Sequence, residues 1–166
     1  MSPNPKLNLE EFLPDFNKDL IFKQINGVVD IYRDSWGIPH IKAKDEFDLF
    51  FAQGFATAQD RLWHMDFDRH RALGKSSELL GYEMFDNDQL VLKIDVLKAS
   101  KLDYECSSDL AKKMLNSYTN GVNAFIESTN NFPVEYSLLN EKPKSWNPWD
   151  CISVYKIRNM FMGTYE

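Results

Sequence analysis

The segment from residue 28 to residue 81 constrains the fold most, because its hydrophobic period changes from two residues to between three and four. Residues 28–34 alternate, which predicts a strand, and one face of that strand carries Val29, Ile31 and Arg33. Residues 34–37, Asp-Ser-Trp-Gly, have the composition of a tight turn. Residues 38–43 predict a returning strand, in which Pro39 lacks an N–H and favours a sheet edge or an irregular start. The segment therefore begins with a predicted β-hairpin.

A long amphipathic helix is predicted directly after the hairpin. Asp45 is the expected N-cap, and Asp48 lies in the first turn, where a carboxylate suits the positive end of a helix. Apolar residues then recur at spacings of three and four, which predicts a continuous buried stripe. The stripe consists of Phe47, Phe51, Phe55, Ala58, Leu62 and Met65. Gly74 and Gly81 are expected to end this helical segment.

The middle of the chain is also predicted to be largely helical. Residues 83–99 can be interpreted as strand or helix, and we favour helix. Another helix should begin at a cap provided by Ser107 or Ser108. Its apolar stripe consists of Leu110, Met114, Tyr118, Val122 and Phe125. Residues 128–146 contain two prolines and predict a loop.

The last predicted helix begins at residues 147–150, Asn-Pro-Trp-Asp, where asparagine can cap and proline suits the first helical position. It is expected to continue to Glu166. Residues 157–165 are rich in methionine and aromatic side chains, and Gly163 interrupts them. Such a stretch fits two interpretations equally well: a helix packed on the core, or the wall of a pocket for an apolar acyl group.

These elements predict an α+β fold class, mostly helical with one strand hairpin. Residues 1–26 form a predicted N-terminal arm, polar and extended over its first twenty residues, and residues 27–166 form a single domain. Aromatic residues make up 14% of the chain, which indicates either an unusually aromatic core or surface buried against a partner. The two cysteines, Cys106 and Cys151, are expected to be buried free thiols rather than a disulfide.

Composition excludes some function classes. A formal net charge of -6 without a Lys/Arg cluster argues against a nucleic-acid partner. No stretch is long and apolar enough to span a bilayer, so no membrane partner is expected. The first residues contain no apolar signal region. As written, the protein is either cytoplasmic or lacks a leader that was removed, and the compartment stays open.

Three candidate catalytic or metal-binding groups have competing structural interpretations. Ser2 could become an N-terminal nucleophile, but the following Pro-Asn-Pro cannot pair in a buried strand. Asp60, His64, Asp68 and His70 could bind a metal ion, but we favour ion pairs between the carboxylates and the arginines at 61, 69 and 71. His40 could act as a general base, and a hydrogen-bonded structural role is favoured. Arg33 and Asp34 are expected to fix the hairpin turn.

Ordered motifs over most of the chain, from residue 27 onward, resemble the α chain of the penicillin acylase family, whose members are N-terminal nucleophile hydrolases. The motifs are RDSWGIPHI at Arg33–Ile41, AQGFATAQDRLWHM at Ala52–Met65, RHRALGKSSELLG at Arg69–Gly81, GVNAFI at Gly121–Ile126, PVEY at Pro133–Tyr136 and WNPWD at Trp146–Asp150. The resemblance implies that the precursor cuts itself and that a longer β chain is the partner. The two chains together would then complete a four-layer αββα sandwich.

The resemblance also implies where the chemistry lies. The nucleophile would be the first serine of the β chain, with its own α-amine as base and oxyanion-hole donors from the same chain. This chain would supply no catalytic residue and no cofactor. The carried-over acyl-pocket positions are Asn159, Met162 and Gly163. Benzylpenicillin-cleaving members carry methionine, arginine and phenylalanine there, so the departure counts against a phenylacetyl specificity.

A calcium ion is possible in the complete αβ enzyme, with an α-chain ligand expected about three residues past Glu166. The implied substrate is a small-molecule N-acyl amide, such as a β-lactam side chain or an acyl-homoserine lactone. Family members are often periplasmic or secreted. Two other classes stay open: a non-catalytic acyl-binding or interaction module, and a metal-dependent hydrolase that uses His64 and its neighbours.

Overall fold

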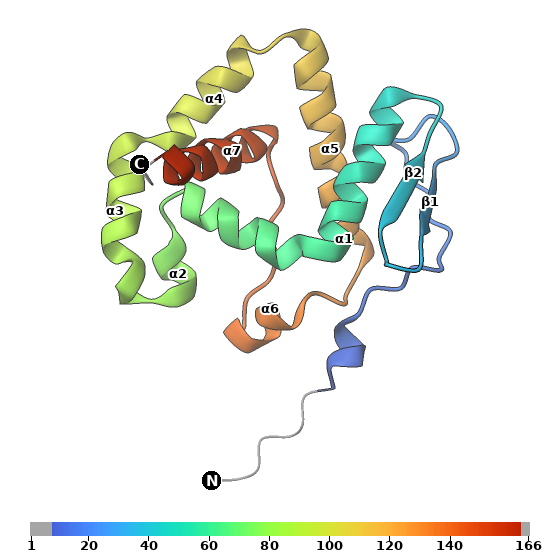
Figure 1. Cartoon of the computed structure of the whole chain (residues 1–166), viewed down its shortest axis with the longest axis horizontal. Helices are drawn as coiled ribbons and strands as arrows, with labels where there is room; N and C mark the ends of the chain where they lie inside the picture. Colours follow the sequence, from blue (N-terminus) through green and yellow to red (C-terminus); the bar gives the residue numbers. More distant parts are fainter. Residues whose placement is uncertain (1–7, 164–166) are drawn as a thin grey trace.

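A computed structural model describes residues 8–163 and is mostly helical, with one two-stranded antiparallel sheet. Ser2 and Glu166 lie outside the described residues. The strands are β1 (Asp30–Arg33) and β2 (Pro39–Lys42). The helices are α1 (Glu46–Ala72), α2 (Ser76–Leu80), α3 (Phe85–Ile94), α4 (Val96–Cys106), α5 (Asp109–Ser128), α6 (Val134–Leu139) and α7 (Pro148–Gly163). Figure 1 shows the hairpin on one flank, beside the first half of α1, and α7 framed by α1, α4 and α5.

The hairpin and its turn form where the sequence predicts them. Ile31 pairs with Ile41, and Ile31 packs against the hydrophobic core. Pro39 is the first residue of β2, where its missing N–H costs no ladder hydrogen bond. The Gly37 N–H donates to the Asp34 carbonyl at 2.9 Å, and the Gly37 φ of 76° is a left-handed conformation that glycine adopts without strain.

Side chains lock this turn in place, as predicted. The Asp34 carboxylate accepts the backbone N–H groups of Trp36 and Ile38 and is hydrogen-bonded to His40 Nε2 at 3.0 Å. The bond to His40 is the main cause that lowers the pKa of Asp34 below its ordinary value. Arg33 reaches from β1 to the Asp60 carboxylate at 2.8 Å, which ties the hairpin to α1. The structural interpretations of His40, Arg33 and Asp34 are therefore confirmed.

The start of α1 is fixed by two acidic residues. The Asp45 side chain caps the helix by accepting the N–H groups of residues 47 and 48, as predicted. Asp48 is buried and accepts the backbone N–H groups of Asn26 and Gly27 at 3.0 and 2.9 Å. This contact holds the chain that leads into the hairpin against the helix.

The bend in α1 was not predicted from the sequence. The helix bends at Arg61, whose φ of -139° and ψ of 19° are not helical. Figure 1 shows the first half of α1 running beside α5, while the second half turns toward α2 and α7. Because of this bend, the two halves of α1 lie at an angle to each other. The pocket described below is lined by residues from both halves.

The main core lies between α1 and α5. Gly54 and Gly121 are buried where the two helix backbones touch. A Cβ atom on Gly54 would lie 2.0 Å from the Tyr118 carbonyl oxygen, and one on Gly121 would lie 1.9 Å from that of Phe51. The buried members of this core are Phe51, Phe55, Ala58, Leu62, Val122, Ala124, Phe125, Tyr136 and Trp146. The predicted apolar stripes of both helices therefore face each other.

A second, smaller core joins the other end of the molecule. Ile157 of α7 packs with Ala72, Val91 and Val96 from α1, α3 and α4. Asp88 of α3 accepts the backbone N–H groups of residues 76 and 77 at 2.8 and 2.7 Å, which fixes the start of α2. Burial acts to raise the pKa of Asp88, but hydrogen bonds from the side chains and backbone N–H groups of Ser77 and Ser76 outweigh it and leave the pKa below its ordinary value.

Several local predictions need correction. Residues 83–99 are helical, but the left-handed backbone of Asp95 divides the segment into α3 and α4. Residues 128–146 include α6 and are not all loop. A 3₁₀ turn at Leu9–Phe12 interrupts the arm that was expected to be extended. Cys106 is a free thiol as predicted but is exposed at the end of α4, because that face of the helix has no covering element among residues 8–163.

Two other predictions can be compared directly with the structure. Ser108, one of the two proposed caps, accepts the Ala111 N–H at 3.2 Å and begins α5. Among the described residues, no helix combines the length and the hydrophobicity needed to cross a membrane.

Candidate functional site

A pocket of about 360 Å³ opens between α1, α5 and α7. Its walls are mostly apolar, with side chains contributed by both halves of α1. The apolar lining includes Phe50, Met65, Met114, Tyr118, Trp146 and Val154. Its size is at the lower end of the range of about 300–1,000 Å³ that is usual for small-molecule sites. The bend at Arg61 and the close α1–α5 contact together shape this space.

A charged group borders the pocket on one side. The buried carboxylate of Asp68 bonds Arg158 of α7 through two guanidinium nitrogens and also lies 3.4 Å from Arg71. His64 Nε2 lies 3.5 Å from the same carboxylate and 2.9 Å from Arg158. Because the Arg158 side chain is 52% exposed, this group presents positive charge and N–H donors at the edge of an apolar cavity.

The thiol on the pocket wall is unsuited to nucleophilic chemistry. Cys151 lies on α7, and its sulfur is 3.9 Å from the Thr119 hydroxyl. Burial raises the pKa of Cys151 to about 11, so that the thiol stays protonated at neutral pH. Burial also raises the pKa of Tyr118 on the opposite wall. The pocket can therefore hold apolar groups, but its own side chains offer no activated nucleophile.

A buried ionic cluster of Asp66, Arg69 and Asp150 lies beside Trp146, which lines the pocket. Arg69 bonds the carboxylate of Asp66 and donates to the carbonyls of Lys144 and Ser145. Its guanidinium lies 3.6 Å from Asp150 and 4.9 Å from the centre of the Trp146 ring. The cluster thus holds α1, the start of α7 and one pocket wall in a fixed arrangement.

Tyr136 connects α6 to this cluster. Its hydroxyl donates to Asp66 at 3.0 Å, and burial with the nearby carboxylate raises the pKa of Tyr136. The phenol therefore stays protonated and acts as a hydrogen-bond donor. The side chains of Asp66, Arg69, Tyr136 and Asp150 are all buried.

The predicted acyl-pocket residues lie elsewhere on α7. Asn159, Met162 and Gly163 are exposed on the last turns of the helix, and none lines the pocket. Asn159 donates a hydrogen bond to the Tyr155 carbonyl, and the Met162 side chain is 77% exposed. The structure brings these three residues together on one exposed helix face. Whether they contact an acyl group stays a prediction.

The rest of α7 divides between the two interpretations of its Met- and aromatic-rich sequence. Ile157, Met160 and Phe161 pack in the smaller core, as a structural helix would. Val154 and Arg158 line the pocket. The helix is therefore both a core element and a pocket wall, at different positions around its circumference.

The ion-pair interpretation of the α1 carboxylates is confirmed, although most of the partners differ from those expected. Asp68 pairs with Arg71, one of the expected arginines, but also with Arg158 of α7, and Asp60 pairs with Arg33 of the hairpin. Arg69 pairs with Asp66, a carboxylate that the sequence analysis did not name. Within residues 8–163, no group of three or more His, Cys, Asp or Glu side chains is arranged to hold a metal ion.

The sequence prediction missed the pocket itself. Met114 and Tyr118 were assigned to the apolar stripe of a core helix, and in the structure they line open space. One sequence signal could have indicated a pocket, namely the methionines on two facing helices. Met65 and Met114 have flexible side chains that suit irregular surfaces. The contact between Asp68 and Arg158 joins residues distant in sequence and left no local signal.

Comparisons with known proteins agree with this architecture. A profile described as penicillin amidase matches residues 28–165. The chain is 41% identical over 156 residues to penicillin acylase 2 proenzyme of Pseudomonas sp. (strain SE83), covering 94% of this chain. It is 29% identical over 138 residues to penicillin G acylase of Escherichia coli, covering 80% of this chain. It is 28% identical over 153 residues to acyl-homoserine lactone acylase QuiP of Pseudomonas fluorescens (strain Pf0-1), covering 92% of this chain.

A solved structure is also similar. Thermostable penicillin G acylase from Alcaligenes faecalis superposes with a TM-score of 0.74 at 26% identity, covering 84% of this chain and 76% of that chain. The chain spans only a fraction of the curated relatives' length, 20% of the Pseudomonas proenzyme and 16% of the Escherichia coli enzyme. The described residues therefore correspond to one part of a longer protein in those relatives.

Proposed function

Because the chain belongs to the penicillin amidase family, we propose that it is the α-chain portion of an enzyme that hydrolyses small-molecule N-acyl amides. The observation that carries the proposal is the 41% identity to a penicillin acylase proenzyme across nearly the whole chain. The substrate would be a β-lactam side chain, an acyl-homoserine lactone or a related amide. Relatives with both kinds of name support this range.

In this proposal the reaction occurs on the β chain. Its N-terminal serine attacks the amide carbonyl, and its own α-amine accepts the hydroxyl proton. Oxyanion-hole donors of the β chain stabilise the charge on the tetrahedral intermediate. The protonated thiol of Cys151 and the paired state of His40 and His64 support a division in which this chain binds and positions without reacting.

The proposed partner is a β chain from the same precursor. The name of one relative, a proenzyme, supports a precursor that is processed. The hairpin also fits this assignment, because a two-stranded sheet is marginal alone and becomes stable when further strands extend it. The two chains would together build the four-layer αββα sandwich, with residues 27–166 in a domain shared between them.

The proposed reaction assigns no step to a calcium ion. The described residues contain no group of three or more His, Cys, Asp or Glu side chains suited to a cation. The α-chain ligand suggested by the family resemblance would lie past Glu166, outside residues 8–163. Calcium in the complete αβ enzyme remains a proposal about other residues.

We propose that Asn159, Met162 and Gly163 contact the acyl group in the assembled enzyme. In the complete enzyme, Gly163→Phe should lower kcat/KM for substrates with long acyl groups by about tenfold or more. The phenyl ring would fill the space that the acyl group occupies. The kcat/KM for an acetyl substrate should change little. A Cβ at Gly163 would meet no atom within 4 Å, so the backbone there has open space beside it.

Leu138→Phe is the matched control, because Leu138 is 69% exposed on α6. It should leave both kcat/KM values unchanged. Equal kcat/KM values for all acyl lengths in Gly163→Phe would remove Gly163 from the acyl site. Acyl ligands that bind to the complete protein without turnover would instead favour the non-catalytic binding module.

A further inference from the structure

The apolar pocket between α1, α5 and α7 continues as an exposed surface along the helices that form it. Leu110 precedes Met114 by one turn on α5, and Leu49 precedes Gln53 by one turn on α1. Both leucines lie on the same helix faces as the pocket-lining residues, and they are 50% and 40% exposed. The apolar surface is therefore longer than the cavity.

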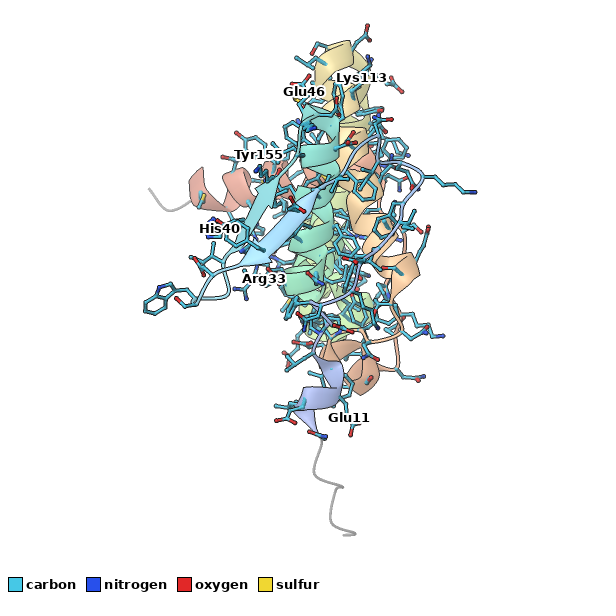
Figure 2. The ribbon with its side chains drawn as sticks, turned by 90° about the vertical axis from the view of Figure 1, so that its right-hand side faces the viewer. Glu11, Arg33, His40, Glu46, Lys113 and Tyr155 are labelled. Atoms are coloured by element: carbon cyan, nitrogen blue, oxygen red, sulfur yellow. The ribbon has the colours of Figure 1, made fainter. Side chains whose placement is uncertain are left out.

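On the α7 side of the pocket, the exposed apolar surface also extends beyond the cavity. Tyr155 follows the pocket residue Cys151 by one helical turn and is 70% exposed. In the view of Figure 2, Tyr155 and His40 lie on the same side of the molecule, the side from which the hairpin projects. An apolar surface that continues beyond a small cavity is typical of a protein–protein contact.

Size and polarity separate a polypeptide occupant from a small ligand. A ligand that fills about 360 Å³ would cover the cavity but would leave Leu110 and Tyr155 exposed. A polypeptide segment could insert side chains into the cavity and also cover the flanking residues. Arg158 fits such an occupant, because one guanidinium nitrogen, Nη1, makes no hydrogen bond among the described residues and can donate to a backbone carbonyl.

The length of the relatives identifies the source of this segment. About four fifths of the length of the Pseudomonas proenzyme lies outside the region that matches this chain, so most of the protein that could meet this surface lies outside residues 1–166. We propose that the α1/α5/α7 pocket is a docking site for an apolar segment of the β chain, whose backbone carbonyl accepts a hydrogen bond from Arg158. This inference rests on the proposed function only for the existence of the downstream polypeptide.

The direct test places a photo-reactive benzoylphenylalanine at position 114 of the complete gene product. Met114 is half-buried on the pocket wall, and a large apolar residue is compatible with open space there. After irradiation, peptide mass spectrometry should find position 114 joined to an apolar peptide from beyond residue 166. The same probe at position 138, on the exposed surface of α6, is the control and should give at least about tenfold less of that product.

The readout is independent of processing and of activity. If the protein is never cleaved, the crosslink still joins position 114 to a downstream peptide, and the docking inference stands while the two-chain proposal fails. Crosslinks confined to residues 1–166 would overturn the docking inference. Loss of the crosslink on addition of a carboxylic acid with an apolar chain would also overturn it, because the pocket would then bind a ligand.

A second variant tests the same contact by charge. Met114→Lys should reduce the amount of β chain recovered with a tagged α chain by about tenfold or more, because docking would bury an unpaired ammonium group. Leu138→Lys adds the same charge to an exposed position and should leave recovery unchanged. Equal recovery for the two lysine variants would contradict the docking site.

Discussion

Gly121→Ala in the complete protein is expected to prevent α1 and α5 from packing in their present arrangement. The added Cβ would lie 1.9 Å from the Phe51 carbonyl oxygen and 2.8 Å from the Phe55 nitrogen. Both atoms belong to a helix backbone, so neither can move aside as a flexible side chain could. Separating the helices would open the core around Phe51 and Phe55 and should cost about 3 kcal/mol or more. The measurement is the melting temperature and the yield of soluble protein.

Gly27→Ala is the matched control. A Cβ there would approach the Asp48 carboxylate at 3.5 Å, an ordinary van der Waals distance, without a strained backbone angle. It should leave the melting temperature within about 2 °C of the parent, because surface substitutions usually change stability by about 0.5 kcal/mol or less. If Gly121→Ala melted like Gly27→Ala, the close contact between α1 and α5 would be wrong.

Arg69→Met should destabilise the complete protein by about 3–5 kcal/mol, because it leaves buried carboxylates without their cation. Arg69 bonds Asp66 and lies 3.6 Å from Asp150, and both carboxylates are nearly inaccessible to water. The carbonyls at residues 144 and 145 would also lose their donor. Thermal unfolding and soluble yield report this loss.

Arg61→Met is the matched control on the same helix, because Arg61 is exposed and makes no ion pair with the described residues. Its melting temperature should stay close to that of the parent. A double variant, Arg69→Met with Asp66→Asn, removes one of the unpaired charges and should recover part of the loss. Failure of Arg69→Met to destabilise the protein would contradict the cluster.

Local chemistry made several elements predictable. Asp45 and Ser108 cap their helices through bonds to N–H groups only two or three residues away, so the sequence could identify Asp45 and narrow the cap of α5 to Ser107 or Ser108. The hairpin follows from alternation and from the turn at Gly37. The predicted stripes of α1 and α5 were correct as helix faces, because helical periodicity is itself a local property.

Long-range contacts explain what the sequence did not show. The bend at Arg61 has no proline or glycine at that residue to mark it in the sequence. Gly54 and Gly121 acquire their role only when the two helices meet. Tyr118 belongs to an apolar stripe whether its face meets a core or an open pocket, so periodicity could not distinguish the two. The short α6 was not predicted because six residues are too few to show a helical period.

The central claim is that this chain is one of two chains cut from a single precursor, the other of which begins with the nucleophilic serine. Intact-mass spectrometry of the protein expressed from the complete gene tests it most directly, together with hydrolysis of a panel of N-acyl substrates. The account predicts two chains, the longer one beginning with serine, and loss of both cleavage and hydrolysis when that serine is replaced by alanine. A single uncleaved polypeptide, or hydrolysis that survives the serine-to-alanine change, would contradict it.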